Sequence, residues 1–204
     1  MSVLICDELV GRDFIEQRKA LGIDGHDEVW EGVYVVAPLA NNEHQAMMFR
    51  LVVALAEVFP APSDVRVFPG VNVSDRDEGW MQNFRVPDVA VFFPGNPAKD
   101  CDTHWCGGPD WATEIASDGD RSREKLEFYA KVGVRELLLI DRDPWGIELY
   151  QLQGGELALA GISNLDQPNE LKSSVFPLSF RLVQGLARPV VQVVTTDGNK
   201  QWHV

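Results

Sequence analysis

An almost uninterrupted apolar run constrains the fold of this chain more than any other feature. Between Glu136 and Asp141 the four residues are Leu, Leu, Leu and Ile, and such a run is typical of a strand that is buried on both faces. A sheet that is covered on both faces needs helices on its two sides. We therefore expect an α/β fold in which helices flank a central mixed β-sheet.

The rest of the chain supplies the helices and strands for such a fold. Either Asn41 or Asn42 is a suitable N-cap for the longest of three segments with helical period. These helices are expected over 7–20, 43–59 and 121–132. Apolar patterns predict strands over 28–38, 65–74, 88–93, 111–117, 136–141, 146–153, 156–160 and 189–196.

Glycine and proline refine this pattern. The strand 28–38 is expected to be kinked at Gly32, and the segment 65–74 to form a strand pair about Pro69-Gly70. The segment 94–110 holds three prolines and three glycines and is typical of a loop. Past Gly161 the sequence favours few strands before Pro189.

Length and composition exclude several classes of protein. The chain has 204 residues, 45% of them hydrophobic and 24% charged, which fits one globular domain. No apolar run approaches the roughly 18–20 residues needed to cross a bilayer, and the first residues lack the pattern of a secretory signal. Three cysteines are an odd count for a disulfide scaffold. We therefore expect a cytoplasmic protein with free thiols and no membrane partner.

Charge is unevenly distributed along the chain. The net charge of −13 argues against a protein that coats nucleic acid, because such affinity comes largely from basic side chains that neutralise phosphates. The window 121–135, however, holds five basic and two acidic residues and carries +3, so the remainder carries −16. We expect a local positive patch on an acidic body.

Two carboxylates and a lysine stand where a purely structural account does not need them. Glu114 lies between two alanines of an alternating strand, so the cost of burying it is high unless that face is exposed to solvent. Asp88 follows Pro87 at a strand entrance, which ordinary turn chemistry also explains. Lys125 lies in a helix, where a lysine is usually a solvated surface group.

Taken together, these three residues favour a metal site. Asp88 and Glu114 lie on successive strands, which brings both carboxylates to one side of a sheet. Neighbouring carboxylates repel each other, and a hard divalent cation relieves that repulsion. A lysine from the next helix can orient a water molecule. These are the elements of metal-assisted phosphodiester hydrolysis.

An ordered set of motifs runs along the chain. It consists of Trp30-Glu31-Gly32-Val33, Glu43-His44-Gln45, Pro87-Asp88, Thr113-Glu114-Ile115-Ala116-Ser117, Lys125-Leu126-Glu127-Phe128-Tyr129, Gly133-Val134 and Leu137 to Asp141. This set resembles the Uma-two family, whose members are restriction-endonuclease-like proteins of the PD-(D/E)xK nuclease superfamily. The resemblance covers about 7–152, with its most specific part between Glu114 and Asp141, and leaves 153–204 as a C-terminal extension of unknown role.

The resemblance implies a single restriction-endonuclease-like domain over 1–204 that binds Mg²⁺ or Mn²⁺ through Asp88, Glu114 and the backbone carbonyl of Ile115. Water would attack the phosphorus in line, leaving a 5′-phosphate. The superfamily's lysine two residues after the glutamate is absent, because that position is Ala116. The resemblance implies that Lys125 on the following helix replaces it.

The family pattern adds further expectations. Glu31 and His44 would flank the site, although both also fit exposed positions. Arg121 and Arg123 would contact nucleic acid, with DNA favoured by the resemblance, or else form a solvated face. A homodimer would supply two sites for two strands. The main alternative is a catalytically inactive module that binds nucleic acid or protein, which the acidic net charge favours; a hydrolase of small phosphodiesters is the third.

Two further signals carry no function in this interpretation. Cys101-Asp102-Thr103-His104-Trp105-Cys106 places two thiols and an imidazole within six residues, but zinc usually takes a second, distant pair, and no matching pair is evident. The run from Asp75 to Gly79 resembles a calcium loop without its spacing. We expect an ordinary loop and a polar turn.

Overall fold

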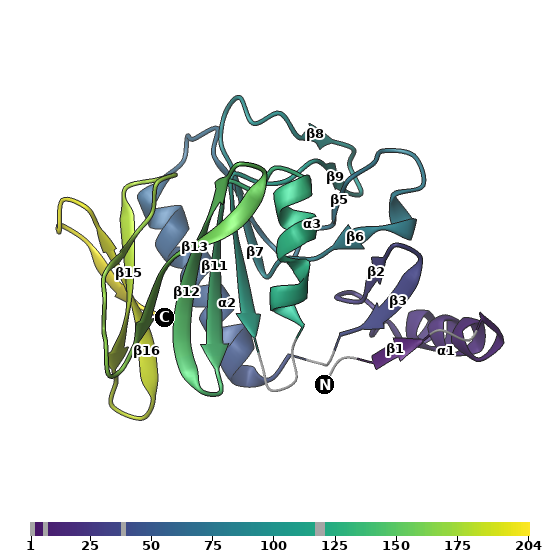
Figure 1. Cartoon of the computed structure of the whole chain (residues 1–204), viewed down its shortest axis with the longest axis horizontal. Coiled ribbons are helices and arrows are strands. Elements are labelled where there is room, and N and C mark those ends of the chain that lie inside the picture. The colour runs from purple at the N-terminus through teal and green to yellow at the C-terminus, as the bar shows by residue number, and fades with distance from the viewer. Residues whose placement is uncertain (1–2, 6–7, 38–39, 117–120) are drawn as a thin grey trace.

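A six-stranded mixed sheet forms the centre of the computed structural model, which describes residues 3–5, 8–37, 40–116 and 121–204 (Figure 1). Its strands lie in the order β13-β12-β11-β10-β7-β4. They are β4 (Arg66–Pro69), β7 (Val89–Phe92), β10 (Trp111–Ala116), β11 (Glu136–Arg142), β12 (Trp145–Gln153) and β13 (Glu156–Asn164). β10 and β11 are parallel, and the other neighbours are antiparallel.

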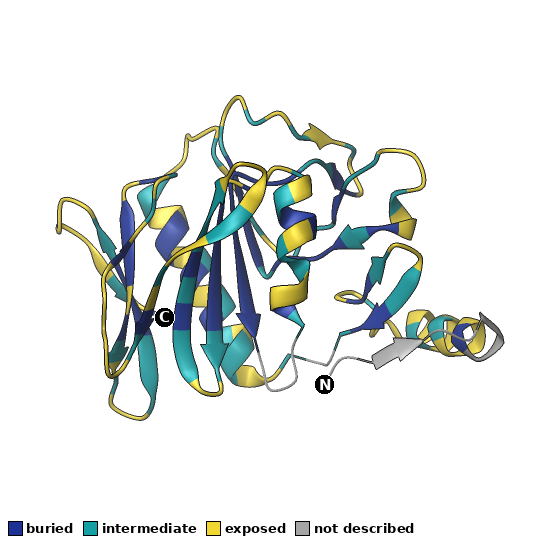
Figure 2. Ribbon diagram, in the orientation of Figure 1, coloured by how far each residue is buried: buried dark blue, intermediate teal, exposed yellow. Residues whose placement is uncertain are grey.

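Helices cover the two faces of this sheet, as the apolar run predicts. Helix α2 (Asn42–Val58) packs Met47, Leu51 and Leu55 into the largest apolar cluster, together with residues of β7, β10 and β11. The crossover from β10 to β11 covers the opposite face through the short 3₁₀ helix η2 (Ser122–Lys125) and α3 (Leu126–Lys131). Figure 2 shows β7, β10 and β11 buried along most of their length.

Alternation along β10 separates its two faces. Trp111 and Ile115 belong to the cluster that contains α2, whereas Ala112 belongs to the cluster formed with α3. Glu114 has the same parity as Ala112 and therefore lies on the α3 face. The sheet thus carries the Glu114 carboxylate beneath the crossover helix.

Two further sheets flank the centre. The seven-stranded sheet has the order β1-β3-β2-β6-β5-β9-β8 and consists of β1 (Val3–Ile5), β2 (Glu28–Trp30), β3 (Val33–Val36), β5 (Val73–Ser74), β6 (Phe84–Arg85), β8 (Lys99–Asp100) and β9 (Trp105–Cys106). The four-stranded sheet consists of β14 (Leu171–Lys172), β15 (Leu178–Gln184), β16 (Pro189–Thr195) and β17 (Gln201–His203). Helix α1 (Glu8–Leu21) and the 3₁₀ helix η1 (Trp80–Gln82) complete the elements.

The helices and central strands are close to their predicted positions, with Asn41 as the N-cap of α2. The predicted element ends at Asp7, Pro38 and Ser117 lie outside the described residues. The segment 28–38 is not one kinked strand: β2 and β3 pair antiparallel across a turn at Glu31 and Gly32. Both turn residues have positive φ, 47° and 84°, which reverses the chain instead of bending it.

Three other expectations need correction. The segment 65–74 is not a strand pair, because β4 pairs with β7 while β5 pairs with β6 and β9 in another sheet. The expected loop 94–110 contains the short pair β8–β9. The stretch before Pro189 contains β14 and β15, and β15 has the alternation of a half-buried strand, with Leu178, Phe180 and Leu182 buried. In the part of the chain that the structure describes, no helix is long and apolar enough to cross a membrane.

Candidate active site

Lys125 reaches the buried face of the central sheet. The chain must cross back over this face because β10 and β11 are parallel neighbours, and Phe128 and Tyr129 anchor the crossover against the sheet. Lys125 lies one turn earlier, and its Nζ lies 2.9 Å from Glu114 Oε2 and 2.8 Å from Glu28 Oε1. Its side chain is only 11% exposed. Lys125 is therefore a partly buried member of a charged cluster and not a solvated surface group.

Glu114 is buried and fully hydrogen-bonded. Tyr129 donates a short hydrogen bond to Oε1, while Lys125 donates to Oε2 and the Ser122 hydroxyl lies 3.4 Å from the same oxygen. Burial raises the pKa of Glu114 well above its ordinary value; Lys125 opposes this shift, and Asp88 and Glu28 add to it. The negative charges of Asp88 and Glu28 near Glu114 thus exceed what the single positive charge of Lys125 balances.

Asp88 lies beside Glu114 at the end of the same strand pair. Val89 pairs with Thr113, so the register places Asp88 opposite Glu114 on one face of the sheet. The Ile115 backbone N–H donates to Asp88 Oδ2 at 2.7 Å. This contact fixes Asp88 next to the residue whose carbonyl the resemblance names as a metal ligand.

His44 contacts the cluster from α2, the helix that packs on the face of the sheet opposite to α3. It lies in the first turn of α2, where Asn41 accepts a hydrogen bond from its backbone N–H. Its Nε2 lies 3.1 Å from Asp88 Oδ1, and its side chain is 13% exposed. The structure therefore brings His44 to Asp88, as the motif order suggests, and does not leave it at an exposed position.

Glu28 is the site residue that the sequence interpretation missed. It opens β2, and its carboxylate accepts from Lys125, from the Val86 backbone N–H at 2.8 Å and from Trp30 Nε1 at 2.6 Å. Only 5% of its side chain is exposed. The signal was available, since Glu28 is a carboxylate at the start of an apolar strand, as unusual there as Glu114 is in β10.

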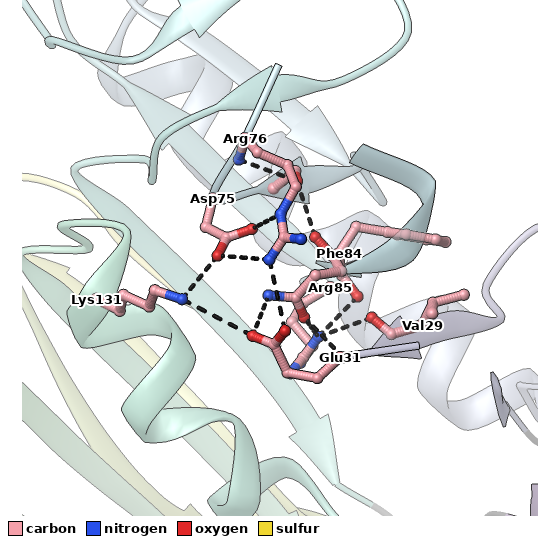
Figure 3. Close-up of polar contacts among 9 residues, drawn as sticks. Val29, Glu31, Asp75, Arg76, Phe84, Arg85 and Lys131 are labelled. Carbon is pink, nitrogen blue, oxygen red and sulfur yellow. Dashed lines mark hydrogen bonds and ion pairs between the residues drawn. The ribbon is translucent and has the colours of Figure 1, made fainter. Parts of the chain in front are cut away.

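Glu31 lies in a different cluster (Figure 3). Its side chain is 65% exposed and accepts from Asn83 Nδ2 at 2.8 Å. Arg76 and Lys131 lie 3.5 and 3.8 Å from its carboxylate. Glu31 occupies the β2–β3 turn. It is therefore not part of the strand β2, whose first residue Glu28 contacts Lys125. The structure thus does not bring Glu31 to Asp88 or Glu114.

The two arginines of the positive window have internal partners. Arg121 pairs with Glu124 and stacks on the Trp30 ring at 4.9 Å. Arg123, half exposed, pairs with Asp141 at 3.0 Å and with Glu148 at 2.8 Å. Both guanidinium groups are therefore held by carboxylates that a phosphate would have to displace.

Comparisons with known proteins identify the family of this chain. A family model described as "Uma2: Putative restriction endonuclease" matches residues 16–185. The chain belongs to the Uma2 family. The Uma2 match extends past residue 152 and includes β14 and β15, so much of the C-terminal extension is part of the family's pattern.

A solved structure supports the same fold. This chain is similar to the "putative nuclease belonging to DUF820" from Anabaena variabilis ATCC 29413, with a TM-score of 0.55 and 21% identity over 72% of this chain and 80% of that one. The restriction-endonuclease-like α/β core that the Uma2 resemblance implies is thus confirmed. No curated protein matches this chain.

The donor atoms of the cluster fit a hard divalent cation. Glu114 and Glu28 contact Lys125, and Asp88 lies near Glu114, so three carboxyl groups accompany one lysine. The ligands that the resemblance names, the Asp88 and Glu114 carboxylates and the Ile115 carbonyl, are oxygen donors, which Mg²⁺ and Mn²⁺ prefer. By donor type, these residues therefore suit either cation.

Proposed function

We propose that this protein is a metal-dependent endonuclease that hydrolyses phosphodiester bonds of nucleic acid, with DNA as the favoured substrate. One observation carries the proposal: Lys125 Nζ lies 2.9 Å from Glu114 Oε2. This contact supports the proposal that Lys125, on the helix after the glutamate strand, would take the role of the superfamily's usual lysine at position 116.

Asp88, Glu114 and the Ile115 carbonyl would hold Mg²⁺ or Mn²⁺. When bound, the cation would polarise the scissile phosphate and lower the pKa of a coordinated water. The water oxygen would form a bond to phosphorus as the bond to the 3′-oxygen breaks, which leaves the phosphate on the 5′ side.

The protein's own side chains would position these groups. Lys125 would orient the attacking water and stabilise charge that develops on the phosphate. Its pKa, which burial alone would lower, is instead raised by Glu114 and Glu28, so it stays protonated and serves as a cation. Glu28 would hold Lys125 in place, Tyr129 would fix the rotamer of Glu114, and His44 would do the same for Asp88.

We further propose that the endonuclease acts in the cytoplasm. We propose that residues 1–204 act as one restriction-endonuclease-like unit and that Arg121 and Arg123 exchange their internal carboxylate partners for phosphates of the substrate. A homodimer would place two such centres on the two strands of a duplex.

A second candidate function has support of its own. Lys125 is paired with two carboxylates, Arg123 with two more, and the chain carries −13 overall. An acidic protein whose cations are internally neutralised finds DNA poorly at physiological salt. The alternative is therefore a module that keeps the nuclease fold for binding nucleic acid or protein.

Metal titration and plasmid nicking separate the two functions. Wild-type protein should bind Mg²⁺ or Mn²⁺ saturably in calorimetry and nick plasmid in its presence, and Asp88→Ala and Glu114→Ala should lose both properties. Glu127→Gln, a change at an exposed carboxylate of α3, is the matched control and should retain both. A folded wild type that takes up no metal and cuts neither DNA nor RNA would refute the nuclease and leave the binding module.

A further inference from the structure

Two loops that carry no function in the sequence interpretation meet in the structure. Asp77 belongs to the polar turn between β5 and η1, and Cys101 and His104 belong to the turn between β8 and β9. The Asp77 carboxylate, the Cys101 thiol and a ring nitrogen of His104 each offer one ligand atom, and these atoms all lie within 4.8 Å of one another. The turn with Cys101 and His104 thus has a further potential metal ligand, Asp77, from a distant part of the sequence.

His104 points independently to a ligand. Its side chain is almost fully buried, with 4% of the residue exposed, and its Nε2 is a buried atom without a hydrogen-bond partner among the described residues. Its Nδ1 lies 3.2 Å from the Thr103 hydroxyl, and the Trp80 ring stacks on it at 4.7 Å and 13°. A buried imidazole nitrogen that is left unpaired is costly, and a metal bond would satisfy it while Thr103 holds the tautomer.

The charges around the cluster can adjust to a cation. Lys99 makes a short ion pair with Asp77, and its hydrogen bond lowers the pKa of that carboxyl. The Lys99 side chain is 66% exposed, so a dication could replace it as the counter-ion of Asp77 while the ammonium turns into water. Cys101 is a free, partly exposed thiol, and metal binding would release its proton.

We propose that Asp77, Cys101 and His104 form a second metal site, which binds a zinc-like transition-metal ion with water as the fourth ligand. One sulfur, one nitrogen and one oxygen suit Zn²⁺ and do not suit Mg²⁺, which prefers oxygen alone. Zinc bonds of about 2.0–2.3 Å place tetrahedral ligand atoms roughly 3.3–3.7 Å apart. Because the three ligand atoms lie within 4.8 Å of one another, binding requires them to approach by no more than about 1.5 Å. The site shares no residue with the Asp88–Glu114 cluster, and it clips the turn at 75–79 to the β8–β9 pair.

Cobalt titration of the full-length protein, first stripped with a chelator, tests this site. Co²⁺ is a spectroscopic substitute for Zn²⁺, and a thiolate ligand gives it a near-ultraviolet charge-transfer band that an all-oxygen site does not. We expect one equivalent of Co²⁺ to produce this band in the presence of excess Mg²⁺, and Zn²⁺ to displace it.

Matched variants locate the thiolate. Cys101→Ser should abolish the band, because the substitution removes the thiolate ligand. His104→Gln should weaken Co²⁺ binding at least tenfold. Cys106→Ser removes the other described thiol of the same hairpin and should leave the band unchanged. Absence of the band in folded wild-type protein, or its persistence in Cys101→Ser, would overturn the proposal, and so would its loss in Cys106→Ser alone. None of these results depends on nuclease activity.

Discussion

Lys125 and Glu28 form an ion pair of 2.8 Å although 97 residues separate them in the sequence. Their side chains are 11% and 5% exposed, so the pair is largely shielded from water. Glu28 comes from the seven-stranded sheet and Lys125 from the crossover of the central sheet. The contact therefore joins the two sheets at the candidate active site and ties the orientation of the lysine to the packing of both.

Removing the lysine alone should be strongly destabilising. Lys125→Met leaves Glu28 and Glu114 buried without their cation, and breaking such a buried pair costs on the order of 3–5 kcal/mol of unfolding free energy. The double variant Glu28→Gln/Lys125→Met should recover part of this loss, because one of the stranded charges is gone. Urea denaturation of the two single variants and the double variant measures the coupling, and strict additivity of their effects would contradict the buried pair.

Glu28 and Glu31 should differ sharply in nicking assays. Glu28→Gln weakens the hold on Lys125 and should lower the nicking rate by about 10–100-fold, the range found when the supporting contacts of a site are removed. Glu31→Gln changes an exposed carboxylate of another cluster and should retain the wild-type rate. Single-turnover rates at saturating Mg²⁺ compare the two; equal losses would place Glu31 in the site after all.

Metal affinity should fall as the pH is lowered through the neutral range. Burial raises the pKa of Glu114, so on the acid side of this pKa a proton competes with the cation for the carboxylate. Affinity should then drop by up to about tenfold per pH unit, and binding should release a proton. Calorimetry in buffers of different ionisation enthalpy measures that release, and an affinity that is constant from about pH 6 to about pH 8 would show that Glu114 is already ionised.

Acid stability should depend on Asp75. Hydrogen bonds from Arg76 at 2.7 Å and Lys131 at 2.7 Å hold the pKa of Asp75 well below its ordinary value (Figure 3). Because the folded-state pKa is the lower one, the ionised group contributes stability above about pH 4, which is lost as the pH falls further. Asp75→Asn should lower the unfolding free energy at neutral pH by about 1 kcal/mol and flatten its acid dependence.

The control for this prediction is Asp64→Asn, a change at an exposed aspartate. It should leave the free energy of unfolding unchanged at both ends of the pH range. If Asp75→Asn behaves in the same way, the ion pairs of Asp75 do not contribute to stability.

Salt dependence should reveal whether the two arginines contact phosphates. If Arg121 and Arg123 neutralise phosphates, replacing either by glutamine should reduce the slope of log K against log salt for DNA binding by about 1. Arg50→Gln, at an exposed arginine on the α2 side of the sheet, should not change the slope. An unchanged slope in both site variants would mean that Arg121 and Arg123 stay paired with their carboxylates and do not contact phosphates.

The sequence by itself determined most of the local elements, and it grouped Asp88, Glu114 and Lys125 in one candidate site. Burial and alternation depend on neighbouring residues. The apolar run before Asp141 therefore indicates the central strand, and the alternation along the strand places Glu114 on the same face as Ala112. The motifs from Asp88 to Lys125 also suffice for the family, because they lie close together and in a characteristic order.

Only the tertiary structure decided which distant groups complete the site. Glu28 meets Lys125 because β2 packs beside the crossover, and Asp77 meets His104 because two turns 27 residues apart close on each other. Such contacts depend on the packing of whole sheets, and no local period encodes them. The same reason explains why the sequence analysis named Glu31 and not Glu28 as a site residue. Both are glutamates, and it is the position of the turn at Gly32 that determines which of them faces Lys125.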